Sequence, residues 1–293
     1  MIPTLSNAHC WNPTFNPLPT LYRLDYFVLQ RVSPCMMPIF APKCRGRLGD
    51  IPFRYLLIKQ TSVYFTFLMA KPSKDEIHYL LLKLHSLTGI IPVGAFLVVH
   101  LCVNSLRTVG VWPYQLSIDA INNLPFLLII EITFIYIPIL FHSAMGFYVI
   151  RLGKTNAHRY RYPRNGLYTM QRLSGAVVFV FLIYHLGTTV APKLWEGKHH
   201  FEAAPFLIDI MNGEFQTWQG MLIYTIGIIS ATFHFSNGLW GFCVSWGILI
   251  GENAQKNGAI IFAMIGLALT VLGMATVAEF NMNPVPVEAT VAR

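Results

Sequence analysis

The chain has 293 residues, of which 54% are hydrophobic and 12% charged, and its mean hydropathy is +0.51. This composition lies far from that of an ordinary soluble domain and predicts a membrane protein. The basic residues behind the net charge of +8 lie mostly in loops between apolar stretches, so they indicate orientation in a membrane and not a nucleic-acid partner. The 5 cysteines form no CxxC or CxxCH pattern, so neither iron–sulfur ligation nor covalent haem attachment is indicated.

Residues 1–68 differ from the rest of the chain. They contain eight prolines and seven basic against two acidic residues, with no sustained helical or strand period. They also lack the apolar core and cleavage site of a signal peptide. At Met69 a polar start runs into an apolar stretch. We therefore expect residues 1–68 to be an over-extended translation start, with a disordered tail as the alternative.

Five apolar stretches follow, each long enough to cross ~30 Å of hydrocarbon as a helix rising ~1.5 Å per residue. They run over Leu84–Leu106, Leu124–Ile150, Met170–Val190, Trp218–Ile250 and Ala259–Phe280. The fourth is too long for a perpendicular helix, so it is predicted to tilt or to project beyond the bilayer. The sequence thus predicts an all-α membrane protein with a five-helix bundle over residues 69–283 and a tail over residues 284–293.

The connection between the second and third spans is the most basic part of the chain and contains Arg151, Lys154, Arg159, Arg161, Arg164 and Arg172. This excess predicts that the connection faces the cytoplasm, together with the N-terminus of the bundle. The connections 107–123 and 191–217 would then lie outside. Their Trp112, Tyr114 and Trp195 suit an interfacial aromatic belt or, equally, surface packing.

Each of the first four spans contains one histidine well inside it, namely His100, His142, His185 and His234. The fifth span contains none. Because an uncompensated polar side chain in hydrocarbon is costly, such residues face the bundle interior and have partners. A single buried histidine is most often a satisfied hydrogen-bonding group. One on each of four helices, about one helix hairpin apart, instead fits ligands contributed helix by helix.

The depth of these histidines predicts how they pair. At a rise of ~1.5 Å per residue, His100 lies ~24 Å from the cytoplasmic end of its span and His185 lies ~20 Å beyond Arg172. His142 lies ~12 Å from Ile150 by the same measure. His100 and His185 would therefore share the outer depth, and His142 the inner one.

His234 is ambiguous by depth, since it lies ~24 Å from Ile250 but ~13 Å from Cys243. We favour the second value and hence two pairs, each holding one haem b by bis-imidazole ligation of its iron. The outer pair is His100 with His185, and the inner pair is His142 with His234. Nearby glycines such as Gly89 and Gly175 would leave room for a macrocycle, although close helix packing explains them equally well.

Three further residues at the cytoplasmic edge are candidates for the haem periphery. His85 and Ser86 begin the first span, and Arg172 begins the third. Their polar groups suit contacts with a haem carboxylate or with the membrane boundary.

Four stretches together resemble a known family: LHSLTGIIPVGAFLVVHLCVN, PILFHSAMGFYV, RYPRNGLYTMQRLSGAVVFVFLIYHL and TFHFSNGLWGF. Over residues 76–280 the chain resembles the di-haem cytochrome b membrane anchor of succinate:quinone oxidoreductases, of the single-chain five-helix type. In that family the inner haem is held from helices two and four and the outer haem from helices one and three, which implies the same two pairs. Some fumarate reductases of the family carry a glutamate two residues before the helix-four ligand; Thr232 stands there in this chain, which favours the dehydrogenase-like members.

The resemblance implies electron transfer from an iron–sulfur subunit through two haem b groups to a membrane quinone, menaquinone in this subtype. A flavoprotein and an iron–sulfur subunit on the cytoplasmic face would carry succinate oxidation, for which this chain has no site. It further implies a multi-pass subunit of the bacterial cytoplasmic membrane. Glu131, the one acid well inside a span, is then the candidate for protonating quinone at an outer site, with structural pairing as an equal alternative.

Two other functions remain open from the residues alone. A transporter could use intramembrane histidines as a proton relay, but it would call for broken helices and clustered ionisable residues at mid-depth, which are few here. A quinol-oxidising cytochrome b of the respiratory chain would place two ligands on each of two helices, whereas this chain has one on each of four.

Overall fold

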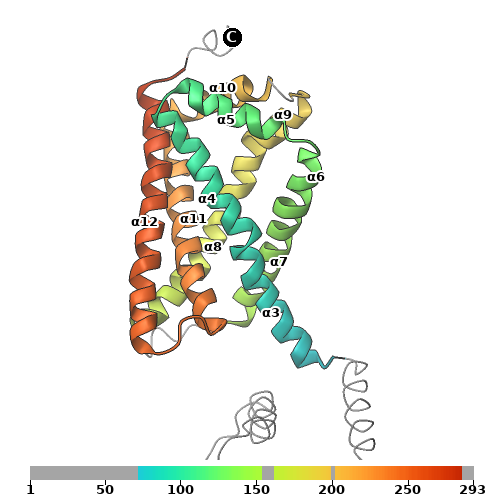
Figure 1. Ribbon diagram of the computed structural model, residues 1–293, viewed down its shortest axis with the longest axis vertical. Coiled ribbons are helices and arrows are strands. Elements are labelled where there is room, and N and C mark those ends of the chain that lie inside the picture. The colour runs from blue at the N-terminus through green and yellow to red at the C-terminus, as the bar shows by residue number, and fades with distance from the viewer. Residues whose placement is uncertain (1–71, 154–161, 199–201, 286–293) are drawn as a thin grey trace, which may run out of the picture. The chain divides into compact units, whose positions relative to one another are not determined.

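The computed structural model describes residues 72–153, 162–198 and 202–285. All the regular structure in this part of the chain is helical (Figure 1). The segment expected to be a translation-start extension or a disordered tail, residues 1–68, lies outside the described residues, as do residues 286–293 of the predicted tail.

The first long helical segment starts at a sequence-encoded cap and bends at a proline. Helix α3 spans Lys74–Ile90, and Ser73 and Glu76 form a reciprocal capping box at its start, with the Ser73 amide donating to the Glu76 carboxylate at 2.7 Å. Helix α4 follows over Pro92–Ser105. Proline lacks an amide hydrogen and its ring clashes with the carbonyl four residues earlier, which accounts for the break between the two helices.

The second helical segment is also irregular. Helix α6 spans Leu127–Glu131, a π-helical turn covers Ile132–Tyr136, and α7 spans Ile137–Leu152. Pro138 lies at the start of α7, where the same loss of a backbone donor favours a change of helical pitch. The remaining long helices are α8 over Pro163–Thr188, α11 over Trp218–Ser245 and α12 over Glu252–Met282.

Short helices occupy the two connections that the sequence predicted to lie outside. A 3₁₀ turn over Leu106–Thr108 leads to α5 over Val111–Asn122, and α9 over Val190–Trp195 precedes α10 over Ala203–Phe215. We call α5, α9 and α10 the cap helices, because they gather at one end of the bundle (Figure 1). The end that carries them is the cap end.

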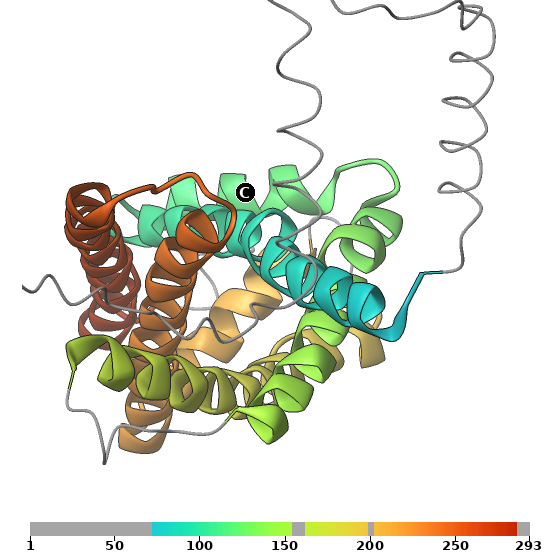
Figure 2. The same ribbon diagram turned by 90° about the horizontal axis from the view of Figure 1, so that it is seen from below.

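Helix α11 is the central element. It contacts α3, α8, α10 and α12, while α3 also packs on α7 and α4 on α12 (Figure 2). Glycines allow the close approach of α11 and α12: a Cβ at Gly266 would meet Ser236 Cβ at 2.8 Å, and one at Gly273 would meet Ile228 Cγ2 at 2.8 Å. Small residues at such contacts are typical of membrane helix pairs.

The buried apolar core lies under the cap helices. It joins residues of α5, α10, α11 and α12 with Val285, which follows α12; the helical members are Tyr114, Ile118, Ala204, Ile208, Met211, Phe215, Tyr224, Ile228, Val277 and Phe280. Tyr114 is 3% exposed, so the prediction that it belongs to an interfacial belt or to surface packing is wrong. Burial raises the pKa of its hydroxyl above the ordinary value. Trp112 and Trp195 are exposed, at 62% and 93%.

Within the described residues, four helical segments are long and apolar enough to cross a membrane: Lys74–Thr108, Leu127–Leu152, Pro163–Trp195 and Glu252–Met282. Large apolar side chains cover their outer surfaces, for example Leu140 at 72%, Val180 at 67% and Leu267 at 66% exposure, as lipid contact requires. Helix α11 is not among the four. Its polar residues Thr232 and Ser236 are buried against other helices, at 1% and 6% exposure.

The predicted fourth span was too long at its C-terminal end. Helix α11 ends at Ser245, because Trp246 leaves the helical region with φ −93° and ψ 3° and Gly247 takes a positive φ of 71°. A positive φ favours glycine, so Gly247 gives the chain its turn toward α12.

Candidate functional site

The imidazole rings of the four histidines lie in two pairs, and each pair is T-shaped. The centroids of the His100 and His185 imidazoles, on α4 and α8, are 5.9 Å apart with planes at 74°. Those of His142 and His234, on α7 and α11, are 6.2 Å apart at 88°. Two imidazoles that bind one metal from opposite sides have centroids roughly 6 Å apart, since each metal–nitrogen bond is about 2.0 Å and each ring adds about 1 Å. Both pairs therefore have the separation that one iron between them requires.

Measured from the C-terminal ends of their helices, His234 and His142 lie at similar depths. His234 lies eleven residues before Ser245, or ~17 Å along the helix, and His142 lies ten residues before Leu152, or ~15 Å. This pair therefore lies toward the end opposite the cap helices. His185 lies three residues before the end of α8, so the other pair lies toward the cap end.

The second nitrogen of three of these rings has a hydrogen-bond partner. Nδ1 of His142 lies 2.9 Å from the main-chain oxygen of His85, and Nδ1 of His234 lies 3.0 Å from that of Gln171. Nδ1 of His185 lies 3.1 Å from the Tyr224 hydroxyl. An imidazole whose Nδ1–H is donated to an oxygen has its Nε2 lone pair free and oriented for a metal. This donor set fits haem iron.

Glycines form the surface on which the inner rings lie. A Cβ at Gly175 would come within 2.8 Å of His234 Cε1, and one at Gly89 within 2.8 Å of His142 Nδ1. Each imidazole thus packs directly on the backbone of the neighbouring helix. The glycines near the candidate ligands therefore make room for the ligand rings themselves.

His85 belongs to the surroundings of the inner pair. Its ring stacks on His142 with centroids 4.1 Å apart, and its buried Nδ1 has no hydrogen-bond partner among the described residues. Ser86 donates to the Lys83 carbonyl at 2.9 Å and accepts from Trp246 Nε1 at 3.2 Å. Both residues therefore lie at the end of the bundle where the inner pair is found.

Arg172 is engaged with the C-terminal end of α7. Its guanidinium donates to the carbonyls of Ile150 and Gly153, the latter at 3.0 Å, and it lies over the Tyr168 ring at 5.4 Å. A cation at the carbonyl end of a helix is favourable. The described contacts of Arg172 thus tie α8 to α7.

Glu131 is the last residue of α6 and is half-buried beside the π-helical turn. None of the ion pairs found within the described ranges includes it. A second carboxylate, Glu214 of α10, accepts a hydrogen bond at 2.6 Å from the hydroxyl of Tyr184, the residue that precedes His185.

The sequence alone did not indicate Glu214 of α10 or Tyr224 of α11, because nothing in their spacing marks a contact of α8 with α10 or with α11.

No group of three or more His, Cys, Asp or Glu side chains suited to a metal ion is found among residues 72–153, 162–198 and 202–285. Each histidine pair offers two imidazole nitrogens, which would suit the iron of a haem held by two histidines.

Similarity to a known protein identifies the family of this chain. No family model matches the chain. The chain is 33% identical over 198 residues to the succinate dehydrogenase cytochrome b558 subunit of Bacillus subtilis (strain 168), an alignment that covers 68% of this chain and 95% of that protein. The chain belongs to the succinate dehydrogenase cytochrome b family. Membership makes it a membrane-anchor subunit of an electron-transporting oxidoreductase complex, and it decides against the transporter.

Proposed function

We propose that this cytochrome b subunit passes electrons from an iron–sulfur subunit to membrane quinone, with one haem b held by each histidine pair. The observation that supports this is that the four histidine rings, on four different helices, lie in two pairs with centroids 5.9 and 6.2 Å apart. Haem b bound at these sites would supply one-electron transfer between successive carriers. The chain's own contribution is to hold the four rings in place.

Each residue of the site has its own role in this proposal. His142 and His234 hold the inner iron, and their Nδ1 atoms are kept in place by the main chains of α3 and α8. His100 and His185 hold the outer iron near the cap end. His85 and Ser86 are the candidates for the periphery of the inner haem. Arg172 remains a candidate for contact with a haem carboxylate, because its bonds to the carbonyls at the end of α7 use Nη2 alone and a guanidinium has five N–H donors.

The arrangement in the membrane follows from the same proposal. Helix α11 is the fifth span, placed among the other four. The basic connection between α7 and α8 faces the cytoplasm, where the flavoprotein and the iron–sulfur subunit bind next to the inner pair. Quinone, proposed to be menaquinone, is reduced on the opposite side, where Glu131 lies toward the outer end of its span and is the candidate proton donor. The membrane is the bacterial cytoplasmic membrane.

A redox titration of visible spectra tests the proposal. Membranes that contain the full complex are titrated with each of the four histidines replaced in turn by alanine. The wild type should show two b-type components. Replacing His100 or His185 should remove one component, and replacing His142 or His234 should remove the other. A wild type with fewer than two components, or variants that do not fall into these two groups, would contradict the proposal.

A further inference from the structure

The hydrogen-bond partner of His185 Nδ1 is a side chain alone. His142 and His234 each direct Nδ1 at a main-chain carbonyl oxygen, and the Ser174 hydroxyl also lies 3.3 Å from Nδ1 of His234. His185 instead directs Nδ1 at the phenolic oxygen of Tyr224, 3.1 Å away. A side chain can be exchanged by substitution and a main-chain carbonyl cannot, so this contact is open to direct test.

Packing fixes the Tyr224 hydroxyl in this place. The side chain is 5% exposed, and its ring lies edge-on to Phe215 at 4.8 Å and to Phe181 at 5.3 Å between centroids. The ring plane of Tyr224 is at 86° to that of His185. A tyrosine held on several sides by aromatic neighbours presents its hydroxyl in a single direction.

The His185 ring is held by the same neighbours. Phe181, one turn earlier on α8, stacks on it with centroids 5.6 Å apart and planes at 17°. Gly227 of α11 makes room for this stacking, since a Cβ there would come within 2.6 Å of Phe181 Cε2. The imidazole is therefore oriented by a stacked ring on one side and by a hydrogen bond at its edge.

We propose that Tyr224 is the positioning residue of His185 and that its hydroxyl, acting through that imidazole, lowers the reduction potential of the outer iron. The inference rests on the proposed function, because it takes His185 as an iron ligand. With Nε2 on the metal, Nδ1 carries the hydrogen and donates it to the Tyr224 oxygen. A hydrogen-bond acceptor at this position raises the basicity of a ligating imidazole, and a more basic ligand favours the ferric form.

The test uses Tyr224→Phe in the full complex in membranes. This change keeps the ring and its packing and removes only the acceptor. The matched control is Tyr184→Phe, which removes a neighbouring phenolic hydroxyl that bonds Glu214 and not an imidazole. For the wild type and both variants, the midpoint potentials of both b-type components are measured by redox titration, together with the haem content per protein.

In Tyr224→Phe, the midpoint potential of the component that depends on His100 and His185 should rise, while the other component and the haem content keep their wild-type values. Tyr184→Phe should leave both potentials unchanged. Unchanged potentials in Tyr224→Phe, or an equal shift in both variants, would overturn the role of Tyr224. A wild type without two b-type components would instead overturn the proposed function, so the two failures are distinguishable.

Discussion

The main-chain oxygen of His85 accepts a hydrogen bond from Nδ1 of His142 at 2.9 Å, and the two imidazoles stack with centroids 4.1 Å apart. One residue of α3 thus orients the ring of a histidine on α7 and covers its face. The hydrogen bond uses the backbone and the stacking uses the side chain. The two contributions can therefore be separated by mutation.

His85→Ala should keep both b-type components, because the carbonyl that orients His142 remains. Loss of the stacked ring should change the midpoint potential of the component that depends on His142 and His234, and leave the other in place. Redox titration of membranes measures both. Disappearance of a component would instead identify the His85 side chain as necessary for holding haem.

Gly175→Ala should remove or strongly diminish the b-type component that depends on His142 and His234. A Cβ at this position would lie 2.8 Å from His234 Cε1, so the ring must leave its place. Gly166→Ala on the same helix is the control, since a Cβ there meets nothing within 4 Å. Difference spectra of reduced minus oxidised membranes should show the loss in the first variant alone. Two intact components in Gly175→Ala would show that the inner rings are held differently.

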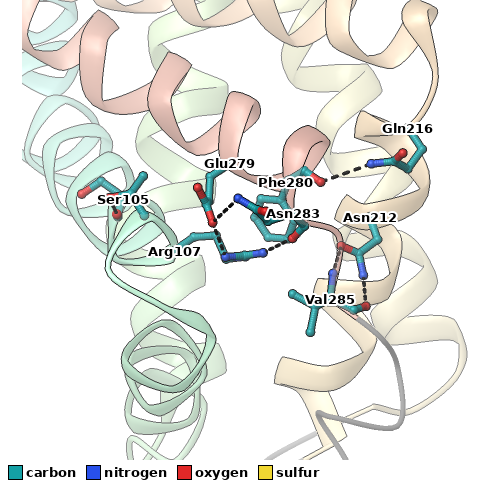
Figure 3. Close-up of polar contacts among 9 residues, drawn as sticks. Ser105, Arg107, Asn212, Gln216, Glu279, Phe280, Asn283 and Val285 are labelled. Carbon is teal, nitrogen blue, oxygen red and sulfur yellow. Dashed lines mark hydrogen bonds and ion pairs between the residues drawn. The ribbon is translucent and has the colours of Figure 1, made fainter.

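The cap end is held by a buried ion pair whose loss should destabilise the protein. Arg107 is 3% exposed and bonds Glu279 at 3.0 Å and the Asn283 carbonyl, beside a second set of bonds between Asn212 and Val285 (Figure 3). Arg107→Ala removes the cation from the Glu279 carboxylate, which is 24% exposed and keeps a hydrogen bond from the Asn283 amide at 3.2 Å. The free energy of unfolding should therefore fall by about 2 kcal/mol, between the values for exposed and fully buried pairs. Thermal unfolding of the purified complex, followed through the haem absorbance, measures the change.

The control for the ion pair is Lys256→Ala. Lys256 pairs with Glu252 at 2.9 Å, but both side chains are mainly exposed, at 64% and 75%. Exposed pairs contribute about 0–1 kcal/mol, so this variant should unfold close to the wild-type temperature. Equal losses in the two variants would mean that burial of Arg107 is not the source of the effect.

Glu131→Gln should slow quinone reduction and leave both haem spectra intact. Removal of a proton-transferring group typically costs on the order of 10²-fold in rate, whereas the amide keeps the shape of the side chain. Succinate:quinone turnover of membranes is the measurement. Glu196→Gln, an exposed carboxylate after α9, should leave turnover unchanged. Unchanged turnover in Glu131→Gln would remove Glu131 from the reaction.

The pairing of the four histidines could be predicted from the sequence, but the depth of His234 could not. One histidine on each of four apolar stretches predicted two pairs, and depth along a helix favoured the partners whose ring centroids lie 5.9 and 6.2 Å apart; their role as iron ligands stays a prediction. The depth of His234 stayed ambiguous because hydropathy does not show where a helix ends. The turn at Trp246 and Gly247 resolves it.

The sequence by itself determined the properties that depend on the chain's own composition and period: a membrane protein, the approximate positions of its long helices, and the histidines inside four of them. Only the tertiary structure decided the contacts between residues far apart in the chain, such as His185 with Tyr224 and Arg107 with Glu279. These depend on the rotation and tilt of one helix against another, which side chains set jointly across the whole bundle. The local sequence pattern therefore predicts helices and the histidines in them, but it predicts few of the contacts between helices.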